Sequence, residues 1–336
     1  MIKNILVANN HLNFVGGSET FTYTVIESLI KKGYNVQYFT FVKGDFSARM
    51  EKELNVSFMS KSSYDLILAN HHTCVKALYK KGYTIQTCHG VFPDLEQPSV
   101  FANYHVSISK EVQNHLLLKG FSSCLIMNGI DLNKFNIKNP INVNLTSVLS
   151  LCQSESANEV IKEACDSMGI LFSSLNKLEN PIWDVADEIN KFDLIVGLGR
   201  SAYEAMACGR PVVIYDNRPY SESFADGYIS DVLPTSLLNN CSGRFYKKKF
   251  TSIDLIEEFK KYNFNDGPKL RKFTEDLLDI ESVCDEYINL ALTLKSNLTH
   301  KKRVLFFQFF RENINARFAR KLFKIFYSKF YKNDLI

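Results

Sequence analysis

Residues 192–213 read FDLIVGLGRSAYEAMACGRPVV. The apolar run at 192–197 predicts a buried strand, and two glycines then predict a tight turn. Residues 201–208 predict a short helix, and Gly-Arg-Pro leads into a second apolar strand at 211–215. Strand, helix and strand at this spacing form the βαβ unit of a parallel sheet, whose strands are apolar on both faces because helices cover both.

The same alternation extends in both directions from this stretch. Further strands are expected at 147–152 and 169–173, with a helix at 157–167 between them. A good helix is also expected from Ser18 as its N-cap to a stop at Gly33. The first 135 residues predict six strands, at 4–8, 35–41, 64–69, 84–88, 104–109 and 123–127.

Turn-forming and polar residues from Asn128 to Pro140 predict a linker between two α/β domains. A length of 336 residues also favours two hydrophobic cores over one. Helical stretches at 254–262 and 268–294 follow the second domain. We therefore expect four parts: an N-terminal domain at 1–135, a second domain at 136–270, a helical crossover segment at 271–300 and a basic tail at 301–336.

Composition restricts the class of protein. A hydrophobic fraction of 46% and a charged fraction of 23% are typical of a globular chain. The eight cysteines include no C-x-x-C pair, which favours buried free thiols in a reducing compartment. The apolar run at 5–8 is too short for a signal peptide, and no run approaches a spanning helix. These features predict a cytoplasmic protein.

Charge is concentrated at the C-terminus. Residues 301–336 hold ten Lys or Arg against two Asp or Glu, whereas the whole chain carries +4. Phe and other apolar residues recur there at three- and four-residue spacing, which predicts a basic amphipathic helix on an anionic membrane surface, through residues 301–332. The alternative is that this stripe packs back on the first domain. The folded body has no coherent basic stripe, so nucleic acid is not expected as a partner.

Three segments carry candidate site residues. Gly16 and Gly17 follow the first strand and open a helix, where backbone amides can approach an anion; a simple tight turn is the alternative. His89 ends a strand of the first domain, at the sheet edge where ligands bind in such folds. A structural hydrogen bond is the alternative for this histidine.

The third segment opens the helix within 192–213. Gly199, Arg200 and the amides of Ser201 and Ala202 would present positive charge to a diphosphate. Two other interpretations stay open. Ser201 and Glu204 have the spacing of a capping box, and Arg200 could be a solvated turn residue.

Taken together and in order, these segments resemble the family 4 glycosyltransferases. The resemblance covers residues 1–290 and rests on GGSE (16–19), TCHG (87–90), VSISKEVQNHLLLKGF (106–121), NGIDLNKF (128–135) and EAMACGRPVV (204–213). It implies the GT-B fold, in which two Rossmann-like doubly wound domains face each other across a cleft. It also implies a retaining, metal-independent transferase that uses a nucleotide sugar and no cofactor.

The resemblance also implies roles for individual residues. Gly16 and Gly17 would lie near the donor diphosphate, His89 would reach the donor sugar, and Glu204 would hold the nucleotide ribose. The donor would be UDP- or GDP-linked. The basic tail adds the hypothesis that the acceptor, a glycan or lipid-linked sugar, lies at the inner face of the plasma membrane. The chain contains no Asp-x-Asp motif and no obvious metal ligands, and carboxylate pairs do not suggest a hydrolase.

Two positions depart from that family's pattern. Val196 stands where a glutamate often precedes the ribose glutamate by eight residues, and the loop around Gln153 lacks the usual phosphate-binding Arg and Lys. Arg200 is the expected substitute, with Arg210 second. These departures leave open a non-catalytic homologue that binds a sugar nucleotide or a partner transferase. An epimerase acting on a nucleotide sugar is a third alternative.

Overall fold

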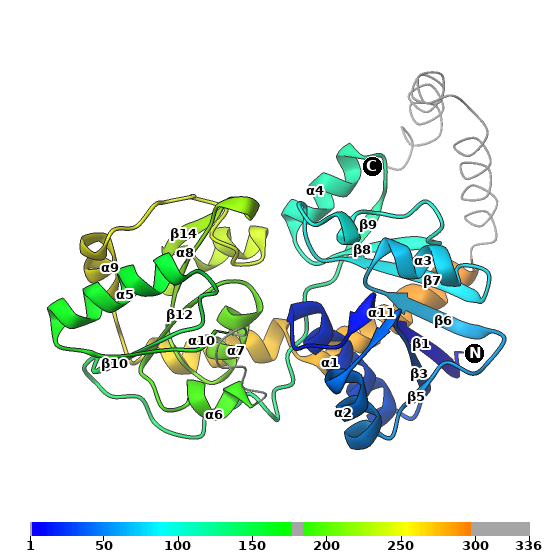
Figure 1. Ribbon diagram of the computed structural model, residues 1–336, viewed down its shortest axis with the longest axis horizontal. Coiled ribbons are helices and arrows are strands. Elements are labelled where there is room, and N and C mark those ends of the chain that lie inside the picture. The colour runs from blue at the N-terminus through cyan, green and yellow to red at the C-terminus, as the bar shows by residue number, and fades with distance from the viewer. Residues whose placement is uncertain (1, 177–183, 297–336) are drawn as a thin grey trace.

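The computed structural model describes residues 2–176 and 184–296 and shows two α/β domains side by side (Figure 1). Each domain has one main sheet with helices on both faces. The expected α/β class is confirmed. The predicted amphipathic helix at 301–336 lies outside the described residues.

The first domain contains a seven-stranded parallel sheet in the order β5-β3-β1-β6-β7-β8-β9. The chain starts in β1, an interior strand, and adds strands on either side of it, as in a doubly wound sheet. Its elements are β1 (Asn4–Ala8), β2 (His11–Leu12), α1 (Gly17–Lys31), β3 (Asn35–Phe39), β4 (Val42–Lys43), α2 (Asp45–Leu54), β5 (Ser57–Phe58), β6 (Tyr64–Ala69), α3 (His72–Leu78), β7 (Gly82–Cys88), the 3-10 helix η1 (Asp94–Glu96), β8 (Tyr104–Ser107), α4 (Lys110–Leu118) and β9 (Ser123–Leu125).

The second domain contains a five-stranded sheet in the order β11-β10-β12-β13-β14, with only β14 antiparallel. Its described elements are β10 (Ser147–Ser150), α5 (Glu155–Met168), β11 (Leu171–Ser174), α6 (Val185–Ile189), β12 (Leu194–Gly197), α7 (Arg200–Ala207), β13 (Val212–Arg218), η2 (Pro219–Ser221), β14 (Ser223–Tyr228), α8 (Ile229–Ser236), η3 (Leu237–Asn239), α9 (Ser252–Phe259) and α10 (Asp266–Leu277). The helix α11 (Ile280–Ser296) then returns to the first domain.

The apolar run of β1 is continuous because both faces of the strand are buried. Ile5 and Val7 belong to one hydrophobic cluster, whereas Leu6 and Ala8 belong to another on the opposite face of the sheet. All four side chains are buried. Burial of both faces removes apolar surface from water on each side, which stabilises a parallel sheet between two helical layers.

The start of α1 differs from the sequence prediction. The N-cap is Gly16, in an extended conformation, and Ser18 lies inside the first turn. A Cβ atom on Gly16 would come within 2.3 Å of the Glu19 carboxylate, which packs against this position. The prediction of Ser18 as N-cap was therefore wrong, because Glu19 folds back over the first turn.

Two chain segments cross between the domains and pair with each other. Ile130 donates its N–H to the carbonyl of Leu278 at 2.7 Å and accepts from the N–H of Ile280 at 3.1 Å. A Cβ on Gly129 would lie 2.9 Å from the Ile280 Cα atom, so no side chain fits there. This pairing interrupts the helical stretch expected at 268–294, which forms two helices, α10 and α11, instead of one.

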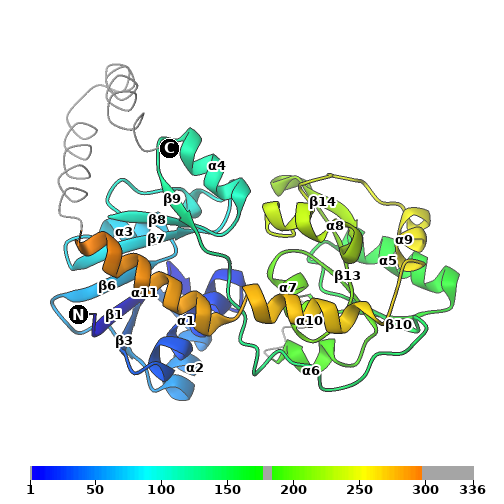
Figure 2. The ribbon, with the colours of Figure 1, turned by 180° about the vertical axis from the view of Figure 1, so that it is seen from behind.

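The helix α11 packs on the first domain. Val283, Tyr287 and Ala291 join the hydrophobic cluster of α1 and β1, and the Tyr287 hydroxyl lies 2.8 Å from Thr87 Oγ1. Figure 2 shows α10 and α11 running in sequence across the back of both domains. The last described helix therefore covers the sheet of the domain in which the chain began.

Other findings concern the cysteines and the membrane. All eight cysteines are free, as expected, and seven are buried. Among the described residues no helix combines the length and apolar character needed to span a bilayer. Within the same residues no group of three or more His, Cys, Asp or Glu side chains is arranged to hold a metal ion.

Candidate functional site

The predicted site residues from both domains meet where the domains touch. Arg200, at the start of α7, donates from Nη2 to Thr24 Oγ1 in α1 at 3.3 Å. The His89 ring, just after β7, lies edge-on against Phe21 of α1, with 5.0 Å between ring centroids. The structure thus brings the start of α1, His89 and the start of α7 together around one helix.

The side chain of Glu19 fills the space beside the first turn of α1. Its carboxylate is buried, lies 3.4 Å from His11 Nε2, and occupies the space beside Gly16. Around Gly17, by contrast, a Cβ atom would meet nothing within 4 Å. The two glycines therefore differ: Gly16 accommodates the chain's own carboxylate, whereas Gly17 borders open space.

His89 is held in its neutral form. Burial lowers the pKa of His89 to about 3, with His71 and Arg200 acting in the same direction and Asn128 opposing them. Its Nε2 lies 3.2 Å from Asn70 Oδ1, and because this oxygen is an acceptor, the contact favours the tautomer with the proton on Nε2. A neutral imidazole with this tautomer can accept a hydrogen bond from a hydroxyl group.

Arg200 and Glu204 form a buried ion pair one turn apart on α7. Arg200 Nε donates to Glu204 Oε1 at 2.8 Å, and Nη1 donates to the carbonyl of Gly129 at 3.1 Å. The side chains of Arg200 and Glu204 are only 11% and 9% exposed. Burial raises the pKa of Glu204, and the Arg200 charge opposes that rise.

These contacts decide between the open interpretations of the segment. The N-cap of α7 is Gly199, so Ser201 and Glu204 do not form a capping box. Arg200 is not a solvated turn residue, because its guanidinium has a partner at each of its three nitrogens. Both alternatives were wrong, because the charges of Arg200 and Glu204 satisfy each other one helical turn apart.

The backbone amides at the start of α7 are partly engaged. Gly199 has a positive φ of 58°, a conformation that favours glycine, and its N–H donates to the carbonyl of Cys241 at 2.8 Å. The N–H groups of Ala202 and Tyr203 bond back to the Gly199 carbonyl. The amides of Arg200 and Ser201 are then the ones at this end without an intrahelical acceptor.

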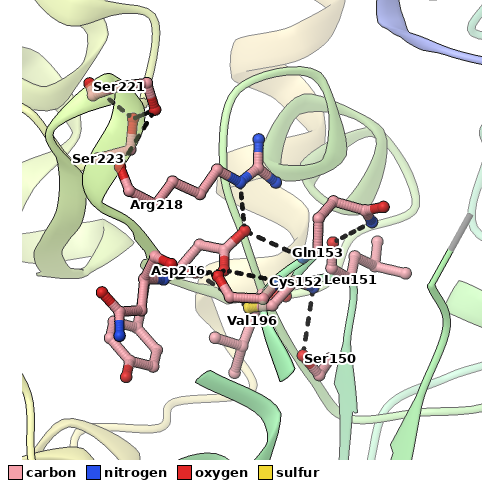
Figure 3. A network of polar contacts seen from close by, with 12 residues as sticks. Ser150, Leu151, Cys152, Gln153, Val196, Asp216, Arg218, Ser221 and Ser223 are labelled. Atoms are coloured by element: carbon pink, nitrogen blue, oxygen red, sulfur yellow. Dashed lines mark hydrogen bonds and ion pairs between the residues drawn. The ribbon is translucent and has the colours of Figure 1, made fainter. Parts of the chain in front are cut away.

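A carboxylate lies where the phosphate-binding Arg and Lys were expected. Asp216, near the end of β13, is fully buried and accepts from the backbone N–H of Gln153 at 3.0 Å and of Ser154 at 3.3 Å (Figure 3). It also accepts from Ser154 Oγ at 2.6 Å and from Arg218 Nε at 2.5 Å. The amides of the loop that leads into α5 are thus engaged by the chain's own carboxylate.

Sequence reasoning missed Asp216 and Arg218. Both follow the apolar run of β13, at the same edge of the sheet as the loop that carries Gln153. The rule that ligands bind at the carboxyl ends of parallel strands could have singled them out. Arg210, the second expected substitute, is buried and donates to the carbonyls of Cys208, Asn139 and Asn190, so it supports the linker.

A second ion pair joins the domains away from α7. Arg244 Nε donates to Glu111 Oε1 at 2.8 Å, and Nη2 bonds the other carboxylate oxygen at 2.5 Å. The Arg244 guanidinium also lies 5.8 Å from the Phe92 ring centroid. Nearby, burial raises the pKa of Glu96 to about 7, opposed by Arg244 and assisted by Glu19.

Solved structures share this architecture. Anabaena HepE, in complex with UDP and glucose, superimposes with a TM-score of 0.60 at 13% identity, covering 88% of this chain and 100% of that chain. A glycosyltransferase from Rickettsia africae ESF-5 gives 0.60 at 13% identity, covering 88% and 99%. The lipopolysaccharide outer core galactosyltransferase WaaB gives 0.52 at 14% identity, covering 87% and 99%.

These similarities show the fold. The chain has the GT-B architecture of two Rossmann-like domains, as expected from its sequence. No protein-family model matches the sequence, and no curated protein matches it.

Proposed function

We propose that this protein is a glycosyltransferase that moves a sugar from a nucleoside-diphosphate donor to a glycan or lipid-linked acceptor, with retention and without a metal. The observation that carries the proposal is the meeting of His89, α1 and the Arg200–Glu204 pair where the two Rossmann-like domains touch. Fold neighbours include HepE bound to UDP-glucose and a pneumococcal O-GlcNAc transferase bound to UDP and GlcNAc, which supports a nucleotide-sugar donor.

Glu204 is the proposed ribose ligand. Its Oε1 accepts from Arg200, which leaves Oε2 as the acceptor for a ribose hydroxyl. Arg200 then acts as a positioning residue, because its own contacts to Gly129 and Thr24 fix the carboxylate relative to both domains. This role replaces the direct phosphate contact expected from the sequence.

The remaining groups serve the sugar and the leaving group. Neutral His89 would accept, at Nδ1, a hydrogen bond from a hydroxyl group of the donor sugar. As the bond between sugar and phosphate breaks, negative charge develops on the leaving nucleoside diphosphate. The amides of Arg200 and Ser201, at the start of α7, and of Gly17, beside open space, are the fixed dipoles that would stabilise this charge.

A specific observation keeps a non-catalytic homologue as the second candidate. Asp216 places a carboxylate where family 4 glycosyltransferases have cations, and Arg200 is already neutralised by Glu204. Such a protein would bind a sugar nucleotide without turning it over.

Donor binding and donor turnover separate the two candidates. Purified protein is titrated with UDP and GDP by calorimetry and thermal shift, and incubated with UDP- and GDP-sugars to detect slow hydrolysis. At a hundredfold excess over Kd, binding adds about 2.7 kcal/mol of stability, which raises Tm by roughly 5 °C. Binding with hydrolysis supports the transferase, binding alone supports the homologue, and no binding to either nucleotide overturns both.

Membrane attachment through residues 301–332 is part of the proposal and rests on their sequence alone. Their basic and aromatic residues suit an anionic leaflet, where each Lys or Arg contributes about 1 kcal/mol. We expect cell fractionation to move a chain without 301–336 from the membrane to the soluble fraction. Unchanged membrane association would rule out the tail as the anchor.

A further inference from the structure

The second domain contains five arginines, and one of them, Arg218, differs from the other four in its hydrogen-bond partners. Arg200, Arg210, Arg244 and Arg271 each use both terminal nitrogens, Nη1 and Nη2, in hydrogen bonds to protein oxygens. Arg218 uses only Nε, which donates to Asp216 Oδ2 at 2.5 Å. Within residues 2–176 and 184–296, neither of its terminal nitrogens has a hydrogen-bond or ion-pair partner.

The position of Arg218 is defined by the sheet. It is the last residue of β13, which pairs in parallel with β12, the strand that leads into α7. Figure 3 shows its guanidinium reaching over the ends of the strands toward the loop that carries Gln153. The side chain is 25% exposed, so part of it is accessible to a ligand.

Asp216 holds this arginine and the loop opposite it at the same time. Its two carboxylate oxygens accept from the amides of Gln153, Ser154 and Asn217 as well as from Arg218 Nε. A buried carboxylate with this many donors is rigid, and its charge is balanced by the guanidinium. Arg218 is therefore pre-oriented with both terminal nitrogens directed away from its protein partner.

We propose that Arg218 binds the diphosphate of the donor through Nη1 and Nη2, and that Asp216 is the residue that positions it. A planar guanidinium with two parallel free N–H groups matches two phosphate oxygens, which a single ammonium cannot do. In this arrangement Arg218, at the end of β13, provides the positive charge that the loop around Gln153 lacks. The inference rests on the proposed nucleotide-sugar donor and names the residue that takes its phosphates.

The test compares ligands that differ only in phosphate. UDP, UMP and uridine, and the guanosine series in parallel, are titrated into the wild-type full chain and into Arg218→Gln. We expect Arg218→Gln to weaken diphosphate binding about 10- to 100-fold, as for a lost charged hydrogen-bond pair, and to leave nucleoside binding unchanged. Arg218→Lys should retain part of the affinity, because it keeps the charge and loses the paired geometry.

A matched variant controls for net charge. Lys162→Gln removes one positive charge from an exposed ion pair on α5, and its nucleotide affinities should equal those of the wild type. Equal diphosphate affinity in Arg218→Gln and the wild type would overturn the assignment while leaving the donor proposal intact. Failure of the wild type to bind any nucleoside diphosphate would instead overturn the proposed function.

The test of Asp216 must distinguish its positioning of Arg218 from a purely structural role in the loop. The ratio of diphosphate affinity to nucleoside affinity does this, because a structural role alone would not change it. We expect Asp216→Asn to reduce the ratio of diphosphate to nucleoside affinity, because it releases the guanidinium from its fixed orientation. A variant that loses both affinities equally, or keeps the wild-type ratio, would show that Asp216 only stabilises the loop. Arg218→Gln tests the phosphate contact on its own if Asp216→Asn does not fold.

Discussion

Glu204→Ala is expected to lower sugar transfer at least 100-fold and to weaken binding of the nucleoside as strongly as that of the nucleoside diphosphate. The carboxylate is the proposed ribose ligand, and its removal also leaves the buried Arg200 without a counter-charge. Both effects act on the part of the site that binds the nucleoside. Isothermal titration with uridine, guanosine and their diphosphates, followed by a transfer or hydrolysis assay, measures them.

The stability of Glu204→Ala must be measured beside its activity. Breaking a buried ion pair by removing one partner costs roughly 3–5 kcal/mol, although the bonds of Arg200 to Gly129 and Thr24 remain. Glu257→Ala, which breaks an exposed ion pair on α9, is the control and should keep wild-type affinity and activity. Full transfer activity in folded Glu204→Ala would refute the ribose assignment, whatever Arg218 does.

Acidification from pH 7 to pH 5 is expected to destabilise the fold through its buried histidines. Burial lowers the pKa of His71 and of His105 to about 4 and that of His89 to about 3, below the value near 6.5 in the unfolded chain. The unfolded state then binds more protons, so stability rises with pH and is lost as pH falls below 6.5. Each histidine contributes a loss of up to about 2 kcal/mol at pH 5.

Glu96 acts in the opposite direction. Its pKa is raised to about 7, so the folded state takes up a proton there before the unfolded state does, and stability is gained as pH falls from 7 toward 4.5. The net loss should therefore be smaller than the histidines alone would give. The groups facing Glu96 are Arg244 and Glu19, with Cys88 beside it.

Urea unfolding at pH 5, 6 and 7.5 tests this balance. His105→Gln keeps a hydrogen-bond donor for the Ser99 carbonyl, and its stability should depend less steeply on pH by about one proton. An unfolding free energy that did not change between pH 7 and pH 5 in the wild type would contradict the prediction.

The strands that sequence predicted best are those buried on both faces. β1 and β6 begin and end where the apolar runs do, at 4–8 and 64–69. β14 was not predicted, because Ser223–Tyr228 contains polar residues and lies antiparallel at the edge of its sheet. A continuous apolar run identifies a strand that helices cover on both faces. It does not identify a strand at the edge of a sheet in which polar residues interrupt the run.

The candidate site shows a similar division. The rule that ligands bind at the carboxyl ends of parallel strands singled out His89 and the start of α7, and both lie just beyond the carboxyl end of a strand. The Arg200–Glu204 pair could have been predicted from its four-residue spacing on a helix. Glu111 and Arg244 lie 133 positions apart, so nothing local in either segment points to the other.

Both chain crossings are tied to each other at Ile130, so a swing of one domain against the other must bend the two segments at the same place. Contacts beside this pivot, such as that of Arg200 with the Gly129 carbonyl, would change little in length during such a movement. The Glu111–Arg244 pair has no such link to the pivot and joins the domains through α4 and the segment after η3. Such a swing would therefore separate the Glu111–Arg244 pair before it disturbed the contact between Arg200 and Gly129.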